Sequence, residues 1–164
     1  MHSRSSRLAV HGSQSLCALG KKLKQQENPS ERAAPYSDKS HVLVVEDEVR
    51  IRIGLADALR GAGFLVIEAA NAEDALKILR SGIAVDVVVS DIRMPGTIDG
   101  SELANIVRNE FFNTKIVLVS GHLPKDRNLS VDGFFLKPLH PASLISHLKV
   151  LIAERTSITL GRYP

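Results

Sequence analysis

The chain has 164 residues, which is enough for one folded domain of ordinary size rather than two. With 44% hydrophobic and 24% charged residues it has the composition of a soluble globular protein, and no run approaches the roughly 18 apolar residues of a membrane span. The single cysteine excludes a disulfide framework and a cysteine-based metal site, so we expect a reducing, cytoplasmic setting and no membrane contact.

The positive charge is concentrated at the start of the chain. Residues 1–40 carry seven Lys or Arg residues against three acids, whereas the remainder is close to neutral. This segment lacks sustained hydrophobic periodicity and is interrupted by Pro29 and Pro35, so we expect a disordered extension. Its bases are not interleaved with a series of aromatic residues, and we predict no direct DNA binding. The predicted folded domain is 41–153, followed by a tail at 154–164.

From His41 onward, strand and helix patterns alternate. Continuous apolar runs bounded by loop residues predict strands buried on both faces. These strands are expected at residues 42–45, 64–67, 86–90, 115–119 and 134–136. Repeated strand–helix units with right-handed crossovers predict an α/β fold, in which helices flank a parallel sheet.

Helices are predicted from apolar residues at helical spacing and from capping residues. The first helix is expected to bury an apolar stripe, namely Ile51, Leu55, Ala58, Leu59 and Ala62. Asn71 and Asp99 are predicted N-caps of the next two helices, and Pro141 suits the first turn of the last helix. The stretch 121–132 is mostly polar, so a helix there would be short or degenerate.

Two of the predicted strands end in acid. Glu46 and Asp47 follow the first strand, and Asp91 follows the third. Ligands of open α/β sheets bind at the carboxyl ends of the strands, where these carboxylates would converge. Like charges about 4 Å apart repel by about 4 kcal/mol at an effective dielectric near 20, so at least one pKa would rise unless a cation binds. Mg²⁺ is the natural candidate, because it takes a few carboxylates and accepts phosphate oxygens.

Two further strands end in residues that suit the same chemistry. Ser120 would bring a hydroxyl and Lys137 an ammonium group to this edge of the sheet. Taken singly, each residue has an ordinary explanation as a loop cap or a solvated surface charge. Acids, hydroxyl and lysine on successive strand ends are much more specific, and together they suit phosphoryl chemistry.

Residues 41 to about 153 resemble the receiver domain of two-component response regulators, of the stand-alone, chemotaxis-type kind. The matching segments occur in family order: Val44–Glu48, Ser90–Gly96 with Asp99-Gly100, Val119–His122 and Phe135–Pro138. The resemblance implies a flavodoxin-like, doubly wound, five-stranded parallel sheet in the order 2-1-3-4-5. It also implies a cis peptide at Lys137-Pro138, which proline makes cheap.

The resemblance also implies a role for each site residue. Asp91 would be the phosphoacceptor, attacking the phosphohistidine of a sensor histidine kinase or a histidine phosphotransfer protein. Glu46, Asp47, Asp91 and the backbone carbonyl of Arg93 would hold Mg²⁺, with Glu46 acting largely through a bound water. Glu46 stands where the family more often has Asp.

The remaining implied roles concern the response to phosphorylation. Lys137 would pair with the phosphoryl oxygens, Ser120 would shift toward them, and Phe134 would be the aromatic switch, without the hydroxyl that Tyr would supply. The loop Gly96–Gly100 is one residue longer than is common in the family.

We therefore expect a stand-alone receiver, a phosphorylation-switched signalling protein that acts through a separate output protein or relays phosphate. Self-phosphorylation and self-dephosphorylation would be its only chemistry. One alternative is a Mg²⁺-dependent aspartyl-phosphate hydrolase, although such enzymes typically have a second acid where Arg93 stands. Another is a flavodoxin-like nucleotide or flavin binder, although the acids after the first strand would repel phosphate. A receiver-like protein that only binds partners is a third.

Overall fold

The computed structural model describes residues 39–123 and 129–160, the last six of these for their backbone only. The predicted N-terminal extension therefore lies, up to residue 38, outside the described residues. Strands and helices alternate along the described chain in this order: β1 His41–Val45, α1 Val49–Gly61, β2 Leu65–Ala69, α2 Ala72–Arg80, β3 Val87–Asp91, α3 Gly100–Glu110, β4 Lys115–Ser120, β5 Gly133–Leu136 and α4 Pro141–Leu160.

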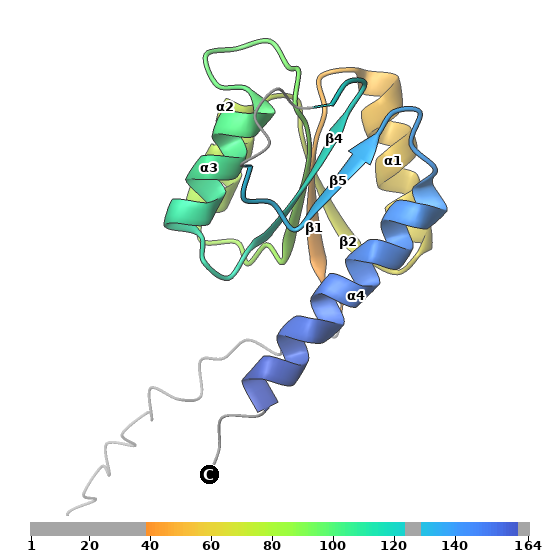
Figure 1. Cartoon of the computed structure of the whole chain (residues 1–164), viewed down its shortest axis with the longest axis vertical. Coiled ribbons are helices and arrows are strands. Elements are labelled where there is room, and N and C mark those ends of the chain that lie inside the picture. The colour runs from red at the N-terminus through yellow and green to blue at the C-terminus, as the bar shows by residue number, and fades with distance from the viewer. Residues whose placement is uncertain (1–38, 124–128, 161–164) are drawn as a thin grey trace, which may run out of the picture. The chain divides into compact units, whose positions relative to one another are not determined.

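The five strands form one parallel sheet in the order β2-β1-β3-β4-β5. Helices α1 and α4 cover one face of the sheet, and α2 and α3 cover the other (Figure 1). The predicted fold class, a doubly wound α/β fold with strand order 2-1-3-4-5, is thus confirmed. The peptide bond Lys137-Pro138 is cis, as the family resemblance implied.

The core is divided between the two faces of the sheet by the alternation of side chains along each strand. Leu43 and Val88 pack on the α2–α3 side, whereas Val42, Val44 and Val87 pack on the α1–α4 side. All five are completely buried. Successive side chains of a strand point to opposite faces, so a continuous run of Val and Leu fills both cores at once. This packing fixes where β1 and β3 end, and with them the acids that follow.

The predicted caps are present. Asn71 accepts a hydrogen bond from the Asp74 amide at 2.8 Å, and Asp99 forms a capping box with Glu102. Pro141 is the first residue of α4, but this helix runs to Leu160, past the predicted domain boundary at 153. The described residues between β4 and β5, at 121–123 and 129–132, form no helix. Residues 124–128 of the expected short helix lie outside the description.

One expected core residue is wrong. Ile51 is 38% exposed, while Leu55, Ala56 and Leu59 are the buried residues of α1. Ile51 stands in the first turn of α1, at the carboxyl edge of the sheet. There its side chain lines a cavity and is not packed against a strand. Among the described residues, no helix is long and apolar enough to span a bilayer.

Candidate functional site

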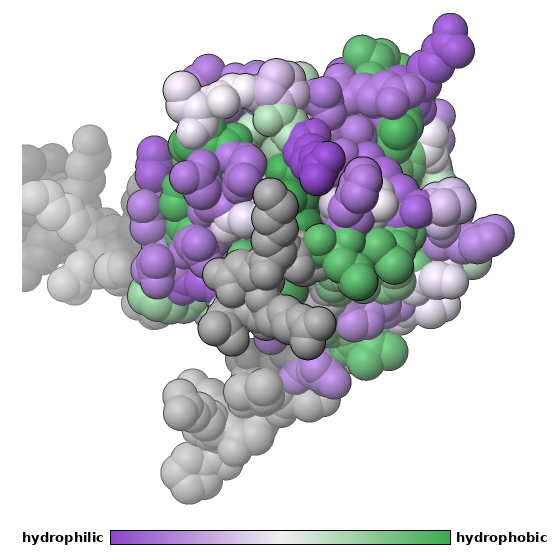
Figure 2. Space-filling view, turned by 45° about the horizontal axis from the view of Figure 1, so that its top comes forward, coloured by the Kyte–Doolittle hydropathy of each residue, from purple (hydrophilic) through white to green (hydrophobic). Residues whose placement is uncertain are grey.

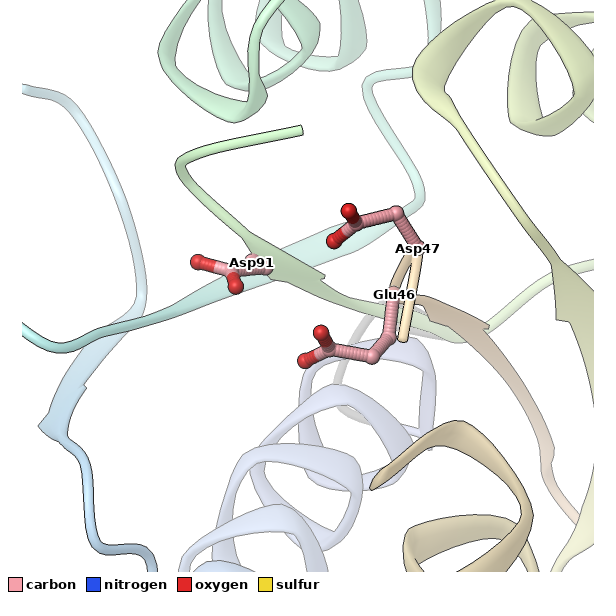
Figure 3. Close-up of side chains that lie close together, drawn as sticks. All are labelled: Glu46, Asp47 and Asp91. Atoms are coloured by element: carbon pink, nitrogen blue, oxygen red, sulfur yellow. The ribbon is translucent and has the colours of Figure 1, made fainter. Parts of the chain in front are cut away.

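Three carboxylates converge where β1 and β3 end, as predicted (Figure 3). Glu46 continues the sheet ladder by one bond, since its amide donates to the Ala69 carbonyl at 3.2 Å. Asp91 is the last residue of β3, the strand beside β1. One oxygen from each of Glu46, Asp47 and Asp91 lies within 4.8 Å of the others. Parallel pairing of two buried strands is therefore what assembles the cluster.

Lys137 is the cation of this cluster. Its Nζ donates to Glu46 Oε2 at 2.7 Å and to Asp91 Oδ2 at 2.5 Å. Burial raises the pKa of Glu46, and the nearby charge of Asp91 adds to the rise, while Lys137 only partly offsets it. Burial would lower the pKa of Lys137, but hydrogen bonds to the two carboxylates outweigh it and raise that pKa. Glu46 and Asp91 thus share one lysine, Asp47 lies beside them, and the cluster has an excess of negative charge.

This donor set fits a hard divalent cation. Glu46 and Asp91 are buried, with 4% and 9% exposure, while Asp47 is exposed and gives a side open to solvent. Carboxylate oxygens are the ligands that Mg²⁺ prefers, and an exposed side leaves room for the waters that it keeps. Asp91 Oδ1 also accepts a hydrogen bond from the Arg93 amide at 3.2 Å, so the backbone of Arg93 runs beside the cluster. Its carbonyl as a ligand stays a prediction.

Neither of the two residues assigned to a switch, Ser120 and Phe134, is part of the carboxylate cluster. Ser120 is buried at the end of β4, where its hydroxyl accepts a hydrogen bond from the His122 amide at 3.2 Å. Its carbonyl accepts from the Lys137 amide at 2.8 Å, which ties it to the cation of the site. Phe134 pairs with Leu118 in the sheet and packs, partly buried, against the α2–α3 core. The switch itself stays a prediction.

Two residues without a predicted role support the site. Arg52 of α1 donates from Nη1 to the Glu46 carbonyl at 2.6 Å, and its Nε lies 3.6 Å from Glu68 Oε2 in β2. Gly100 packs so closely on the backbone of Asp91 that any Cβ there would collide with the Asp91 carbonyl oxygen. Gly100 could be identified from the sequence, because it stands in the Asp99-Gly100 pair of the family motif. Arg52 could not, because its contact with Glu68 forms only when β2 lies beside β1.

A cavity of about 320 Å³ opens next to the cluster. Glu46, Asp91 and Lys137 form its polar end, and residues of α1 and of the segment after β5 form its apolar walls. Figure 2, turned toward this edge of the sheet, shows strongly hydrophilic residues beside a compact apolar patch. Asp91, the phosphoacceptor predicted from the sequence, therefore lines this cavity together with apolar side chains.

The fold and this site define a class of protein, and comparison with known families names it. Residues 42–149 match the model of the response regulator receiver domain. The chain therefore belongs to the response regulator receiver family. This match favours the receiver over the hydrolase and the flavin binder considered above.

Two curated relatives illustrate the similarity. The chain is 36% identical over 136 residues to the sensor kinase CckA of Brucella abortus, which covers 79% of this chain and 14% of that protein. It is 32% identical over 113 residues to a response regulator receiver protein of Anaeromyxobacter, covering 68% and 45%. The chain thus spans at most about half the length of the curated relatives it matches.

Solved structures agree. The response regulator TrrA of Thermotoga maritima, in complex with Mg²⁺-BeF, is 35% identical with a TM-score of 0.63, covering 68% of this chain and 98% of that one. The receiver domain of the hybrid histidine kinase CckA is 32% identical with a TM-score of 0.58, covering 69% and 99%.

Proposed function

We propose that the domain accepts a phosphoryl group on Asp91 from a phosphohistidine, in a Mg²⁺-dependent reaction. The donor would be a sensor histidine kinase or a histidine phosphotransfer protein. The observation that supports this most strongly is the position of Asp91, which shares a carboxylate cluster with Glu46 and Asp47 and binds Lys137. The receiver family accepts phosphate from histidine kinases, and a relative of solved structure is described as a complex with Mg²⁺-BeF.

In the proposed reaction, a carboxylate oxygen of Asp91 attacks the phosphorus. A P–O bond forms while the P–N bond to the donor histidine breaks, leaving an acyl phosphate on Asp91 and returning the imidazole. A Mg²⁺ ion held by Glu46, Asp47 and Asp91 would neutralise charge on the transferring group.

The chain's own residues would then respond to the new group. Lys137 loses its hydrogen bond to the Asp91 carboxylate and takes the phosphoryl oxygens as acceptors instead. Ser120 needs only to leave the His122 amide to donate to the phosphoryl group, and Phe134 would occupy the space that the hydroxyl vacates. The added charge and acceptor oxygens thereby change the surface around β4 and β5.

The proposed output is a change in affinity for a separate protein, or onward transfer of phosphate, without direct binding to DNA. The proposal places the protein in the cytoplasm, where the chain's one cysteine, Cys17, would stay reduced. Whether it acts as a stand-alone receiver stays a prediction.

The direct test is incubation with acetyl phosphate or phosphoramidate plus Mg²⁺, followed by mass spectrometry of the intact protein. We expect one added phosphoryl group that hydroxylamine removes, and that disappears on Asp91→Asn or on removal of Mg²⁺ with EDTA. Asp57→Asn, which changes an exposed acid of α1, is the matched control and should behave like the unaltered protein. A hydroxylamine-labile phosphoryl group that persists on Asp91→Asn would refute the assignment.

A further inference from the structure

Glu73, outside the acid cluster, holds the loop that leaves the phosphoacceptor. It lies in the first turn of α2, and its Oε1 accepts hydrogen bonds from both the amide and the hydroxyl of Thr97, each at 2.8 Å. The two elements it connects are 24 residues apart in sequence. Both bonds lower the pKa of Glu73 and keep it ionised, and the bond from the Thr97 amide has the larger effect. A charged acceptor makes such bonds stronger than neutral ones.

The loop is shaped around this carboxylate. Gly96 has a φ of +135°, a conformation that L side chains rarely adopt. A Cβ built on Gly96 would lie 2.8 Å from both carboxylate oxygens of Glu73, closer than carbon and oxygen allow. The positive φ favours glycine here, and the close approach shows that the backbone of Gly96 lies directly against the Glu73 carboxylate, whose flexible end would have to move to admit a side chain.

The same loop carries the backbone that borders the site. At its start the Arg93 amide donates to Asp91 Oδ1, and at its end the Gly100 amide donates to the Ile92 carbonyl at 2.9 Å. Between these anchors, residues 95–97 are exposed, so core packing does not hold them. Met94 and Ile98, on either side of this tip, pack against the α2–α3 core, and the bonds from Thr97 to Glu73 attach the exposed tip itself to α2.

We propose that Glu73 is a positioning residue of the phosphoacceptor site: by holding Thr97, it fixes the loop between β3 and α3 so that the backbone of Arg93 faces Asp91. This inference rests on the function proposed above. Glu73 is not part of the carboxylate cluster, so its effect is transmitted through the backbone. Groups that orient the ligands of a metal typically change its affinity by tenfold or more when lost, and a contact through a loop should change it less.

The test uses Glu73→Ala in the full chain, with three readouts: the Mg²⁺ dissociation constant by calorimetry, the half-life of the phosphoryl group on Asp91, and hydrogen exchange of the Arg93 and Thr97 amides without metal. We expect Mg²⁺ affinity to fall by about threefold to tenfold, the half-life to change by a similar factor, and both amides to exchange faster. Glu73→Gln should restore all three, because one amide oxygen can accept both bonds from Thr97.

Asp74→Ala is the matched control. Asp74 is also an acid in the first turn of α2, but its carboxylate pairs with Lys77 and Asn71 instead of the loop. It should change stability without changing Mg²⁺ affinity. Glu73→Ala with an affinity and a half-life within twofold of the unaltered protein would overturn the inference, as would Glu73→Gln behaving like Glu73→Ala. An unaltered protein that binds no Mg²⁺ and takes no phosphate would instead contradict the proposed function itself.

Discussion

Two acids in this molecule are similarly withdrawn from water, yet their surroundings are opposite. Glu46 follows β1 at the carboxyl edge of the sheet and shares a single lysine with Asp91. Asp132 precedes β5 at the amino edge, where its carboxylate meets Arg108 at 2.6 Å, Lys115 at 3.2 Å and the Ile116 amide at 2.9 Å. Glu46 thus shares one cationic partner with a second acid, whereas Asp132 has two cationic partners of its own.

The pKa values of these acids move in opposite directions for that reason. Burial raises the pKa of Glu46, and its one shared cation cannot reverse the shift. Burial also opposes ionisation of Asp132, but the Ile116 amide and the two bases outweigh it and lower its pKa. Asp132, which supports the fold, is neutralised within the chain, whereas Glu46, which is proposed to bind an external cation, is left partly uncompensated. The following predictions test this contrast.

The largest expected effect is on stability, at Asp132. Asp132→Ala leaves two bases and a strand amide without their shared acceptor, and it should reduce the free energy of unfolding by about 3 kcal/mol. Urea denaturation measures this loss. Mg²⁺ affinity should stay unchanged, because the residue lies at the other edge of the sheet; a parallel loss of Mg²⁺ binding would break the distinction between the two acids.

Glu46→Gln should have the opposite pattern. The raised pKa means that the ionised side chain is less favourable in the folded protein than in the unfolded chain, so an uncharged amide should stabilise the metal-free protein. The same change removes a ligand charge and should weaken Mg²⁺ binding by about tenfold. Thermal denaturation with and without Mg²⁺ gives both quantities, and Asp57→Asn serves again as the control for a lost surface acid. A destabilised metal-free protein would contradict the argument.

Replacing Lys137 by methionine should remove the competition between the lysine ammonium group and Mg²⁺ for the two carboxylates. Without the ammonium group, Glu46 and Asp91 have no basic partner in the cluster, so Mg²⁺ affinity should rise by about threefold as the metal takes over neutralisation. Phosphorylation of Asp91 should nevertheless slow, because the partner of the phosphoryl oxygens is gone. Calorimetry and the rate of phosphoryl uptake separate these outcomes, and a fall in Mg²⁺ affinity would count against competition.

The smallest expected effect is the response of stability to acid. Because the folded-state pKa of Asp132 is lowered, its ionised form contributes stability above the ordinary carboxyl pKa of about 4, and this contribution is lost as the pH falls through the folded-state value. The difference in unfolding free energy between the unaltered protein and Asp132→Asn should therefore shrink steadily below about pH 4. A difference that is constant across that range would show that the charge of Asp132 is unimportant.

Most of the fold and the acid cluster could be predicted, because both depend on local patterns. Unbroken Val runs marked β1 and β3, and the acids directly after them needed only parallel pairing to meet. The end of β2 was missed because Glu68 interrupts its apolar run; in the structure Arg52 and Arg60 pair with this carboxylate and keep it in an edge strand.

Contacts between elements distant in sequence left no such signal. The pairing of Glu73 with Thr97 and that of Asp132 with Arg108 depend on which helices and strands become neighbours. Ile51 was misplaced for a related reason. Helical spacing identifies a stripe of residues, but it does not say where along the helix the sheet stops covering that stripe.

The lysine of the site comes from far along the chain: 91 residues separate it from Glu46 and 46 from Asp91. A ribosome therefore makes all three acids well before it makes their only basic partner in the cluster. Until β5 pairs with β4, the nascent acids face each other without that lysine, and any Mg²⁺ bound then would be held without it. The lysine proposed to bind the phosphoryl oxygens thus reaches the site only when the last strand has joined the sheet.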